Sequence, residues 1–425
     1  MIFYKETNIK ETPVGRLPED WKVLRLRDVA KVDTGGNAPQ GEKYFKDGRY
    51  PFIRVQHLDG DEIYVDKWDL INDEAVNEYG LKLFPKNSII FPKSGASINL
   101  EKRAMLPFDS YVVNHLCVLV PNHEVIDCRF LFYVMKKTNL SKNSAGTTLP
   151  YLNLEYISKV FVPFPPVSEQ RAIAGVLGVV DSLIAKTDEV IVKTERLKKG
   201  LMQTLLTRGI GHKEFKETEI GKIPKTWQVV KLGEVILEAK SGFASGKRDE
   251  NGILQLRMDS IETDGWINPE AGVRVPIPPD VEEYLLKPGD ILFNNTNSVD
   301  LIGKTAIFRG ELPKCVFSNH LTRIRVNPER VLPEWILYVL IRKWQTGVFK
   351  AICHRHVHQA GINNNDLLNI KIPLPEISEQ QKITQILLTI DKKQKIEKQE
   401  KARVEKIKRC LMDLLLTGKI RVRVD

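Results

Sequence analysis

Two stretches of the chain carry apolar residues at alternating spacings of three and four, the pattern of a long helix that packs along one face. The stretches begin near Ser168 and Ser378, each after a proline-rich run, and end at Gly209 and Gly418. A continuous helix of roughly 40 residues spans about 60 Å. The pattern predicts that the two helices pair as an antiparallel coiled coil through Ile173, Val176, Val180, Leu183, Val190, Leu197, Leu201, Leu205, Ile383, Ile386, Ile390, Val404, Ile407, Leu411, Leu414 and Leu415. Charged residues interrupt the second stripe, so we expect looser packing at Lys393, Glu397 and Glu400.

Before each long helix the apolar runs are shorter and rich in β-branched and aromatic residues, and Gly, Asn, Asp and Pro separate them. Residues 50–55, 88–91 and 113–120 are such runs, and this pattern is typical of strands. Helical spacing returns over 129–137 and again over 334–343. We therefore expect two globular regions of mixed α and β structure.

The chain also repeats itself. Three blocks of the first half recur in the second half: Thr12–Val29 as Thr218–Val235, Val162–Ile173 as Ile372–Ile383, and Leu201–Thr207 as Leu411–Thr417. Asn114-His115-Leu116 likewise matches Asn319-His320-Leu321. The predicted fold class is α+β with a pseudo-twofold internal repeat, and its four segments are a globular region at 1–166, a long helix at 167–209, a second globular region at 210–375, and a second long helix with a tail at 376–425.

Composition adds a partner class. The chain has 425 residues, 64 Lys and Arg against 54 Asp and Glu, and a net charge of +10, a balance that favours a polyanion such as nucleic acid. No run approaches the ~20 apolar residues of a membrane span, and the first residues contain no apolar signal region. We expect a cytoplasmic protein. Reduced thiols and no structural zinc are expected of the scattered cysteines Cys117, Cys128, Cys315, Cys353 and Cys410.

Motifs for chemistry are incomplete. Gly303-Lys304-Thr305 ends like a phosphate loop, but Ser298 stands where the leading glycine belongs. Pro163-Phe-Pro-Pro166 does not supply the Asn/Asp-Pro-Pro-aromatic tetrapeptide of a base-amino methyltransferase. The histidines His354, His356 and His358 alternate as metal ligands on a strand would, but a solvated or phosphate-facing loop explains them better because no carboxylate is adjacent. We expect no metal, no cofactor and no small-molecule substrate.

Basic and amide side chains gather in the glycine-containing loops, where DNA recognition needs donors. Amides pair with adenine and arginine with guanine in the major groove. The candidate DNA-binding residues are Lys43, Lys46, Arg49, Arg54, Lys93, Lys240, Lys247, Arg248, Arg257, Asn294, Asn297, Arg355 and Gln359. Ordinary turn chemistry is the competing explanation for each of them. The basic run from Lys392 to Arg409 is better explained as a solvated helix face.

The repeated blocks together resemble the specificity subunit of type I restriction–modification systems. The likeness rests on Gly-x-Ile/Leu-Pro-x-x-Trp-x-Val opening each half, Pro-x-Pro-x-x-Ser-Glu-Gln-x-x-Ile leading into each long helix, and Leu-Met-x-x-Leu-Leu-Thr closing it. It covers nearly the whole chain in the order target-recognition domain, helix, target-recognition domain, helix. Because the family shares no base-reading motif, individual DNA contacts cannot be carried over.

The resemblance implies a DNA-binding protein without catalytic activity of its own. Each target-recognition domain would read one half of a bipartite, asymmetric site in double-stranded DNA, and the helices would set the spacing. Two methyltransferase subunits that use S-adenosylmethionine would dock on it, and a restriction subunit would join them. Two alternatives stay open: an enzyme, either methyltransferase or nuclease, with duplicated DNA-binding parts, and an adaptor whose globular regions bind proteins.

Overall fold

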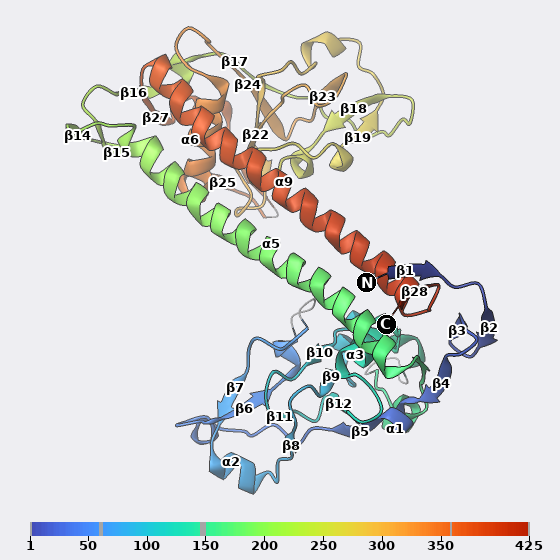
Figure 1. Cartoon of the computed structure of the whole chain (residues 1–425). Coiled ribbons are helices and arrows are strands. Elements are labelled where there is room, and N and C mark those ends of the chain that lie inside the picture. The colour runs from blue at the N-terminus through green and yellow to red at the C-terminus, as the bar shows by residue number, and fades with distance from the viewer. Residues whose placement is uncertain (1, 59–62, 145–149, 358, 424–425) are drawn as a thin grey trace. The chain divides into compact units, whose positions relative to one another are not determined.

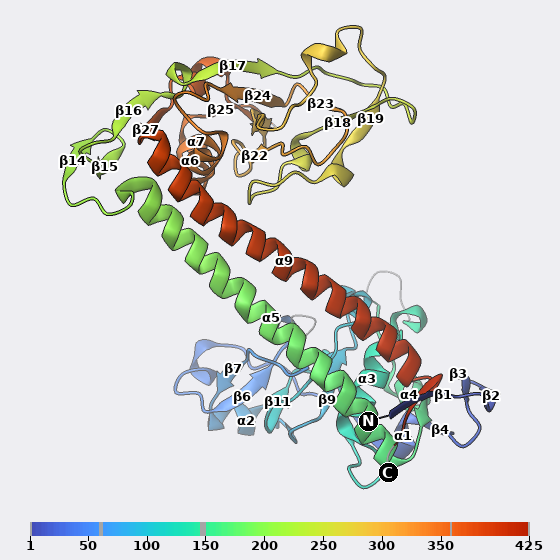
Figure 2. The same ribbon diagram turned by 45° about the horizontal axis from the view of Figure 1, so that its top comes forward.

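The computed structural model describes residues 2–58, 63–144, 150–357 and 359–423. The chain forms two compact units (Figures 1 and 2). The first unit comprises Met1–Glu189 and Gln399–Asp425, and the second comprises Val190–Lys398. Each unit therefore contains a globular region and about half of each long helix. Within the described ranges, no helix has a stretch long and apolar enough to cross a bilayer.

The long helices are α5 (Val167–Arg208) and α9 (Ile377–Leu415), and they pair antiparallel as predicted. In the first unit Lys408 lies 2.5 Å from Asp181 and Lys401 lies 2.6 Å from Asp188. Residue numbers therefore increase along α5 in the direction in which they decrease along α9. The second unit shows the same direction through Lys198–Asp391 at 2.6 Å and Lys398–Glu195 at 3.7 Å.

The packed faces of the two helices differ from the predicted stripe. Of the predicted positions, the structure buries or half-buries Ile173, Val176, Val180, Leu201, Leu205, Ile383, Ile390, Val404, Leu411, Leu414 and Leu415. It leaves exposed Leu183, Val190, Leu197, Ile386 and Ile407, so their assignment to the packed face is wrong. The face is turned by about one residue toward positions that include Leu177, Ile191, Lys198, Leu387, Asp391 and Gln394. An apolar pattern misses this line because polar residues occupy much of it.

The globular region of the first unit has two four-stranded sheets. The first sheet has the order β10 (Ala104–Met105), β9 (Ile89–Pro92), β12 (Leu116–Pro121), β5 (Ala30–Thr34), and the second has the order β7 (Asp69–Ile71), β6 (Tyr50–Ile53), β11 (Ser110–Val112), β8 (Leu83–Phe84). The helices of this region are α1 (Leu26–Val29), α2 (Asp73–Glu78), α3 (Cys128–Lys137) and α4 (Leu154–Ser158). Two-stranded pairings add β1 (Ile2–Lys5) with β28 (Ile420–Arg423), β2 (Ile9–Thr12) with β3 (Gly15–Pro18), and β4 (Lys22–Arg25) with β13 (Phe161–Phe164).

The second unit repeats this plan. Its four-stranded sheet has the order β17 (Ile236–Ser241), β24 (Leu321–Val326), β20 (Ile291–Asn294), β22 (Thr305–Ile307). Two three-stranded sheets follow: β19 (Val273–Val275), β18 (Ile253–Leu256), β23 (Cys315–Phe317), and β21 (Thr296–Asn297), β26 (Ala360–Gly361), β25 (His354–Arg355). The strand pairs are β14 (Phe215–Thr218) with β15 (Gly221–Pro224), and β16 (Gln228–Lys231) with β27 (Lys371–Leu374). The helices are α6 (Pro333–Gln345), α7 (Val348–Ile352) and α8 (Asn364–Leu368).

Each globular region has two cores because its strands alternate. Side chains of successive strand residues point to opposite faces of a sheet. In β9, Ile89 and Phe91 pack with α3 and the long helices, whereas Ile90 packs between the two sheets. In β20, Ile291 and Phe293 pack with α6 and the long helices, whereas Leu292 belongs to the core that includes β18 and β23. The predicted helices at 129–137 and 334–343 are confirmed as α3 and α6.

The Ser-Glu-Gln repeat fastens each long helix to its globular region. The indole of Trp21 donates to Glu169 at 3.1 Å, and Gln170 donates to the carbonyl of Pro165 at 2.9 Å while accepting from the amide of Asp127 at 2.8 Å. The second unit has the same contacts: Trp227 with Glu379 at 2.9 Å, and Gln380 with Pro375 and Leu332, each at 2.9 Å. These shared contacts explain why the opening tryptophan and the Ser-Glu-Gln motif recur together.

Candidate nucleic-acid interface

The loops of each globular region gather at one end of its four-stranded sheet. In the first unit, Cys117 pairs with Thr34 and Leu116 pairs with Pro92, so β5 and β9 both end where β12 begins. In the second unit, Thr322 pairs with Ser241 and Leu321 with Asn294, which places the ends of β17 and β20 at the start of β24. We call these two places the loop ends of the sheets.

The repeated Asn-His-Leu sequence forms the same turn at both loop ends. In the first unit the amide of Lys93 donates to the carbonyl of His115 at 2.9 Å, and in the second the amide of Asn295 donates to His320 at 3.1 Å. Polar side chains surround the first turn, where Ser94 lies 2.6 Å from the His115 ring and Asn114 donates to Asn37 at 2.7 Å. The frame of the turn is shared, whereas the side chains around it differ.

Glycine is required where each loop leaves the sheet. A Cβ atom on Gly35 would lie 1.9 Å from the carbonyl oxygen of Val112, and one on Gly242 would lie 2.1 Å from that of Phe317. Because the obstacle is backbone, no side chain fits. Thr34-Gly-Gly36 and Lys240-Ser-Gly242 therefore pass tightly against the neighbouring sheet before the loops open.

Of the candidate residues in the first unit, Arg54 and Lys93 lie at the loop end. Arg54 follows β6, whose last residue accepts from the amide of Val113 at 2.9 Å, and its guanidinium lies 2.7 Å from Asp69. Lys43 and Arg49 lie away from this end and pair with carboxylates of α2, Lys43 with Glu74 at 2.5 Å and Arg49 with Asp73. Lys46 is exposed in the same region.

In the second unit most candidates do lie at the loop end. Asn297 on β21 and Arg355 on β25 flank Ala360 of β26 from opposite sides, and Gln359 directly precedes Ala360. Arg257 donates to the carbonyl of Ser245 at 3.4 Å, in the loop that also carries the exposed Lys247 and Arg248. Lys240, at the end of β17, pairs with Glu283.

Asn294 needs a correction. Its side chain is completely buried and its amide donates to the carbonyl of Met258 at 3.3 Å. An amide held inside the sheet cannot pair with a base edge. The sequence pattern could not separate it from Asn297, because both stand near the same strand end.

The histidine cluster is divided. His354 lies 2.7 Å from Asp366 and His356 is exposed, while His358 lies outside the described residues. Among the described residues no group of three His, Cys, Asp or Glu side chains could hold a metal ion. Burial raises the pKa of the Cys315 thiol to about 12 and also raises that of Cys117, so both thiols stay protonated at neutral pH.

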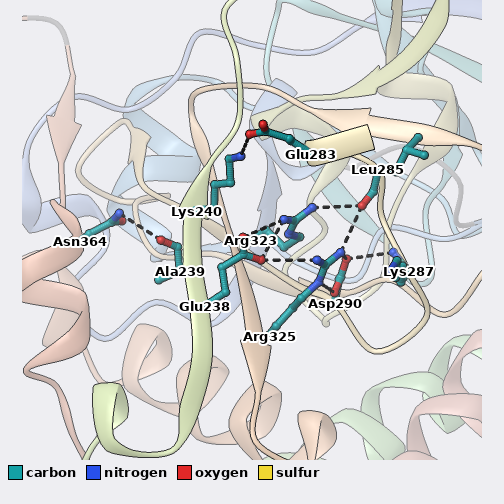
Figure 3. Close-up of polar contacts among 10 residues, drawn as sticks. All are labelled: Glu238, Ala239, Lys240, Glu283, Leu285, Lys287, Asp290, Arg323, Arg325 and Asn364. Carbon is teal, nitrogen blue, oxygen red and sulfur yellow. Dashed lines mark hydrogen bonds and ion pairs between the residues drawn. The ribbon is translucent and has the colours of Figure 1, made fainter. Parts of the chain in front are cut away.

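The second unit contains an arginine network that the sequence did not predict (Figure 3). Arg323 is almost fully buried; it donates to the two carboxylate oxygens of Glu238 at 3.1 and 2.8 Å and to the carbonyl of Leu285 at 3.0 Å. Arg325 donates to Asp290 at 2.8 and 3.0 Å. The network holds the chain before β20 against β17 and β24. The signal of this network in the sequence is that Arg323 and Arg325 alternate with apolar residues along β24.

The ion pairs divide the candidate cations into those that already have an acidic partner and those that do not. In the portion of the chain that the structure describes, no ion-pair partner is found for Lys46 and Lys93 of the first unit, or for Lys247, Arg248, Arg257 and Arg355 of the second. Phosphate contacts require cations that are free to approach DNA, and acidic neighbours compete with phosphate. Among the candidates that the structure describes, the second loop end therefore has more unpaired cations than the first, where Lys93 is unpaired and Arg54 pairs with Asp69.

Comparison with known proteins adds independent findings. Residues 18–194 and 224–406 each match the model of the type I restriction modification DNA specificity domain. The MjaVIII specificity subunit of a type I restriction enzyme from Methanocaldococcus jannaschii is 31% identical over 100% of this chain and 98% of that protein. The putative MjaX specificity subunit from the same organism is 31% identical over 99% and 98%.

Solved structures agree on the fold. The S subunit of a type I restriction–modification system from M. genitalium superposes with a TM-score of 0.60 at 17% identity, over 93% of this chain and 96% of that chain. A chain from a study of assembly in the type I system gives a TM-score of 0.54 at 19% identity, over 95% and 99%.

Proposed function

The chain belongs to the family of the type I restriction modification DNA specificity domain and is a DNA-sequence specificity subunit, and from this premise we propose how its regions divide the work. Each globular region is a target-recognition domain that reads one half of a bipartite, asymmetric site in double-stranded DNA. The two loop ends are the surfaces that approach the bases. The chain itself carries no catalytic activity.

The observation that supports this division is that the frame is shared while the recognition surface is not. Trp–Glu and Gln contacts at the start of each long helix occur twice with nearly equal distances. At the loop ends the first unit offers Lys93, Ser94 and His115, whereas the second offers Asn297, Arg355 and Gln359. Two copies of one frame with different donors are suited to two different half-sites.

We further propose the partners. Two methyltransferase subunits would assemble on the long helices, because the repeat would offer two related docking places. They would transfer the methyl group of S-adenosylmethionine to adenine. A restriction subunit would join this complex. The assembly named in one structural neighbour supports partners of this kind.

A domain exchange tests the proposal. Residues 210–375 would be replaced by the corresponding region of another family member, and the chimaera would be expressed with its methyltransferase subunit. Because the recognition domains are separate, mapping of methylated adenines should show one half-site changed and the other retained. A change in both halves together, or methylation by the isolated chain without a second subunit, would contradict the proposal.

A further inference from the structure

A buried tyrosine, aspartate and lysine meet at one point in the second unit. Tyr338 on α6 donates to Oδ2 of Asp391 on α9 at 2.7 Å, and Nζ of Lys198 on α5 lies 2.6 Å from Oδ1 of the same carboxylate. All three residues are under 9% exposed. One carboxylate thus joins a helix of the recognition domain to both long helices.

The same constellation occurs in the first unit. Tyr133 on α3 donates to Oδ2 of Asp181 on α5 at 2.6 Å, and Nζ of Lys408 on α9 lies 2.5 Å from Oδ1. The two long helices exchange roles: the aspartate is on α5 in the first unit and on α9 in the second. The repeat has therefore kept all three residues, although most of the surrounding sequence has diverged.

Stability alone does not explain a buried ion pair. Its desolvation cost offsets most of the Coulomb gain, and apolar residues of similar volume often stabilise a core as well or better. The best-attested use of buried polar groups between helices is to fix register, because a shifted alignment leaves them unpaired. In each unit the lysine and aspartate lie on different long helices, so sliding one helix along the other would separate them.

The tyrosine adds a third element to this register. Burial raises the pKa of Tyr338 and of Tyr133, and the neighbouring aspartates raise it further, so both hydroxyls keep their protons and donate. Tyr338 is fully buried in α6, whose neighbouring residues pack on the four-stranded sheet. A rotation of the recognition domain on the helix pair would break its hydrogen bond.

We propose that Tyr338–Asp391–Lys198 and Tyr133–Asp181–Lys408 are positioning nodes that fix each recognition domain in one rotational and axial register on the long helices. The nodes make the spacing between the two half-sites strict. This inference rests on the proposed function, because spacing has meaning only if both domains read DNA. The six residues are positioning residues and contact neither DNA nor the reacting atoms.

The first test removes a single oxygen. Tyr338→Phe would be assembled with the methyltransferase, and methylation rates would be measured on DNAs with the native half-sites and a spacer of wild-type length, one base pair shorter or one longer. Loss of one hydrogen bond to a charged group should lower the preference for the wild-type spacer by about tenfold. Half-site sequences should not change. Thr389→Ala is the control, since its hydroxyl donates to Gln385 within α9.

A second variant separates register from stability. In Tyr338→Phe/Asp391→Leu/Lys198→Met every polar member of the node becomes apolar, so the melting temperature should be kept or raised. Spacer preference should nevertheless fall at least as far as in Tyr338→Phe. If the triple variant does not fold, Tyr338→Phe still decides the question.

The outcomes are distinguishable. Equal losses of rate on all three spacers, or wild-type spacer preference in Tyr338→Phe, would overturn the positioning role. Absence of sequence-specific methylation by the wild-type complex would instead contradict the proposed function. Tyr133→Phe should reproduce the loss of spacer preference from the first unit, and a normal preference there would overturn the proposal for that node.

Discussion

The two recognition domains have the same frame but differ inside it. Counting from the shared Asn-His-Leu turn, β12 carries Val118 and Val120 at the positions where β24 carries Arg323 and Arg325. Val118 is completely buried in the core between the two sheets, whereas Arg323 is buried by pairing with Glu238. One domain thus uses apolar packing where the other uses an ionic network. The constant regions lie where the helices attach, and the divergent regions begin inside the sheets that carry the loop ends.

The largest effect is expected at the shared frame. Trp21→Ala and Trp227→Ala each remove a fully buried indole and one of the hydrogen bonds to the glutamate at the start of the long helix. Each substitution should reduce the free energy of unfolding by about 3–5 kcal/mol. Hydrogen exchange should place the loosened amides in the unit that carries the substitution. Clearly unequal losses would show that the two frames are not equivalent.

The ionic network distinguishes the second domain from the first. Glu238→Leu leaves the buried guanidinium of Arg323 without its carboxylate and should cost about 3 kcal/mol, measured by denaturant unfolding. The matched control is Glu238→Leu with Arg323→Met, which removes both charges and should recover most of the loss. A loss as large in the double variant would mean that packing, and not charge pairing, holds this sheet.

The corrected helix face predicts that two leucines of α5 contribute very differently to the free energy of unfolding. Leu177 is completely buried, whereas Leu183, a member of the predicted stripe, is 49% exposed. Leu177→Ala should cost about 2–3 kcal/mol and Leu183→Ala under about 0.5 kcal/mol. Thermal unfolding of the two variants measures this difference. The reverse order would restore the stripe predicted from the sequence.

A smaller effect is expected on DNA affinity. Lys247→Ala/Arg248→Ala removes two exposed cations at the second loop end and should reduce the slope of log affinity against log salt by about one to two. Lys43→Ala/Arg49→Ala should change that slope little, because α2 carboxylates already pair with both side chains. Anisotropy titrations of the assembled complex over a range of salt give both slopes. Equal slope changes would contradict the ranking of the two surfaces.

The sequence predicted the structural features that come from its internal repeat and from the regular spacing of its apolar residues. Helix pairing, the mixed α and β globular regions and the family were all readable, because each rests on residues that recur along the chain. The packed helix face was misplaced because Lys198, Asp391 and Gln394 lie on it and an apolar pattern assigns such residues to solvent. Asn294 was assigned to DNA because a strand's end and its interior look alike in sequence.

The positioning nodes show most clearly what a single sequence does not predict. Tyr338, Asp391 and Lys198 come from three elements that are far apart in the chain, and no spacing rule joins them. Their only signal in one sequence is that Tyr133, Asp181 and Lys408 stand at matching places in the repeat. The same limit applies to DNA contacts, because burial and ion pairing decide which cations remain available.

The central claim is that the long helices set the distance between two independent recognition domains. Four residues would be inserted between Glu189 and Val190 of α5 and four between Lys398 and Gln399 of α9, positions that face each other according to the Asp188–Lys401 contact. Each helix gains about 6 Å and roughly 40° of rotation beyond one turn, while one or two base pairs add about 3.4–7 Å and turn DNA by roughly 35–70°. Mapping of methylated adenines should show both half-sites unchanged and a spacer longer by one or two base pairs. Full methylation at the original spacer would contradict the account.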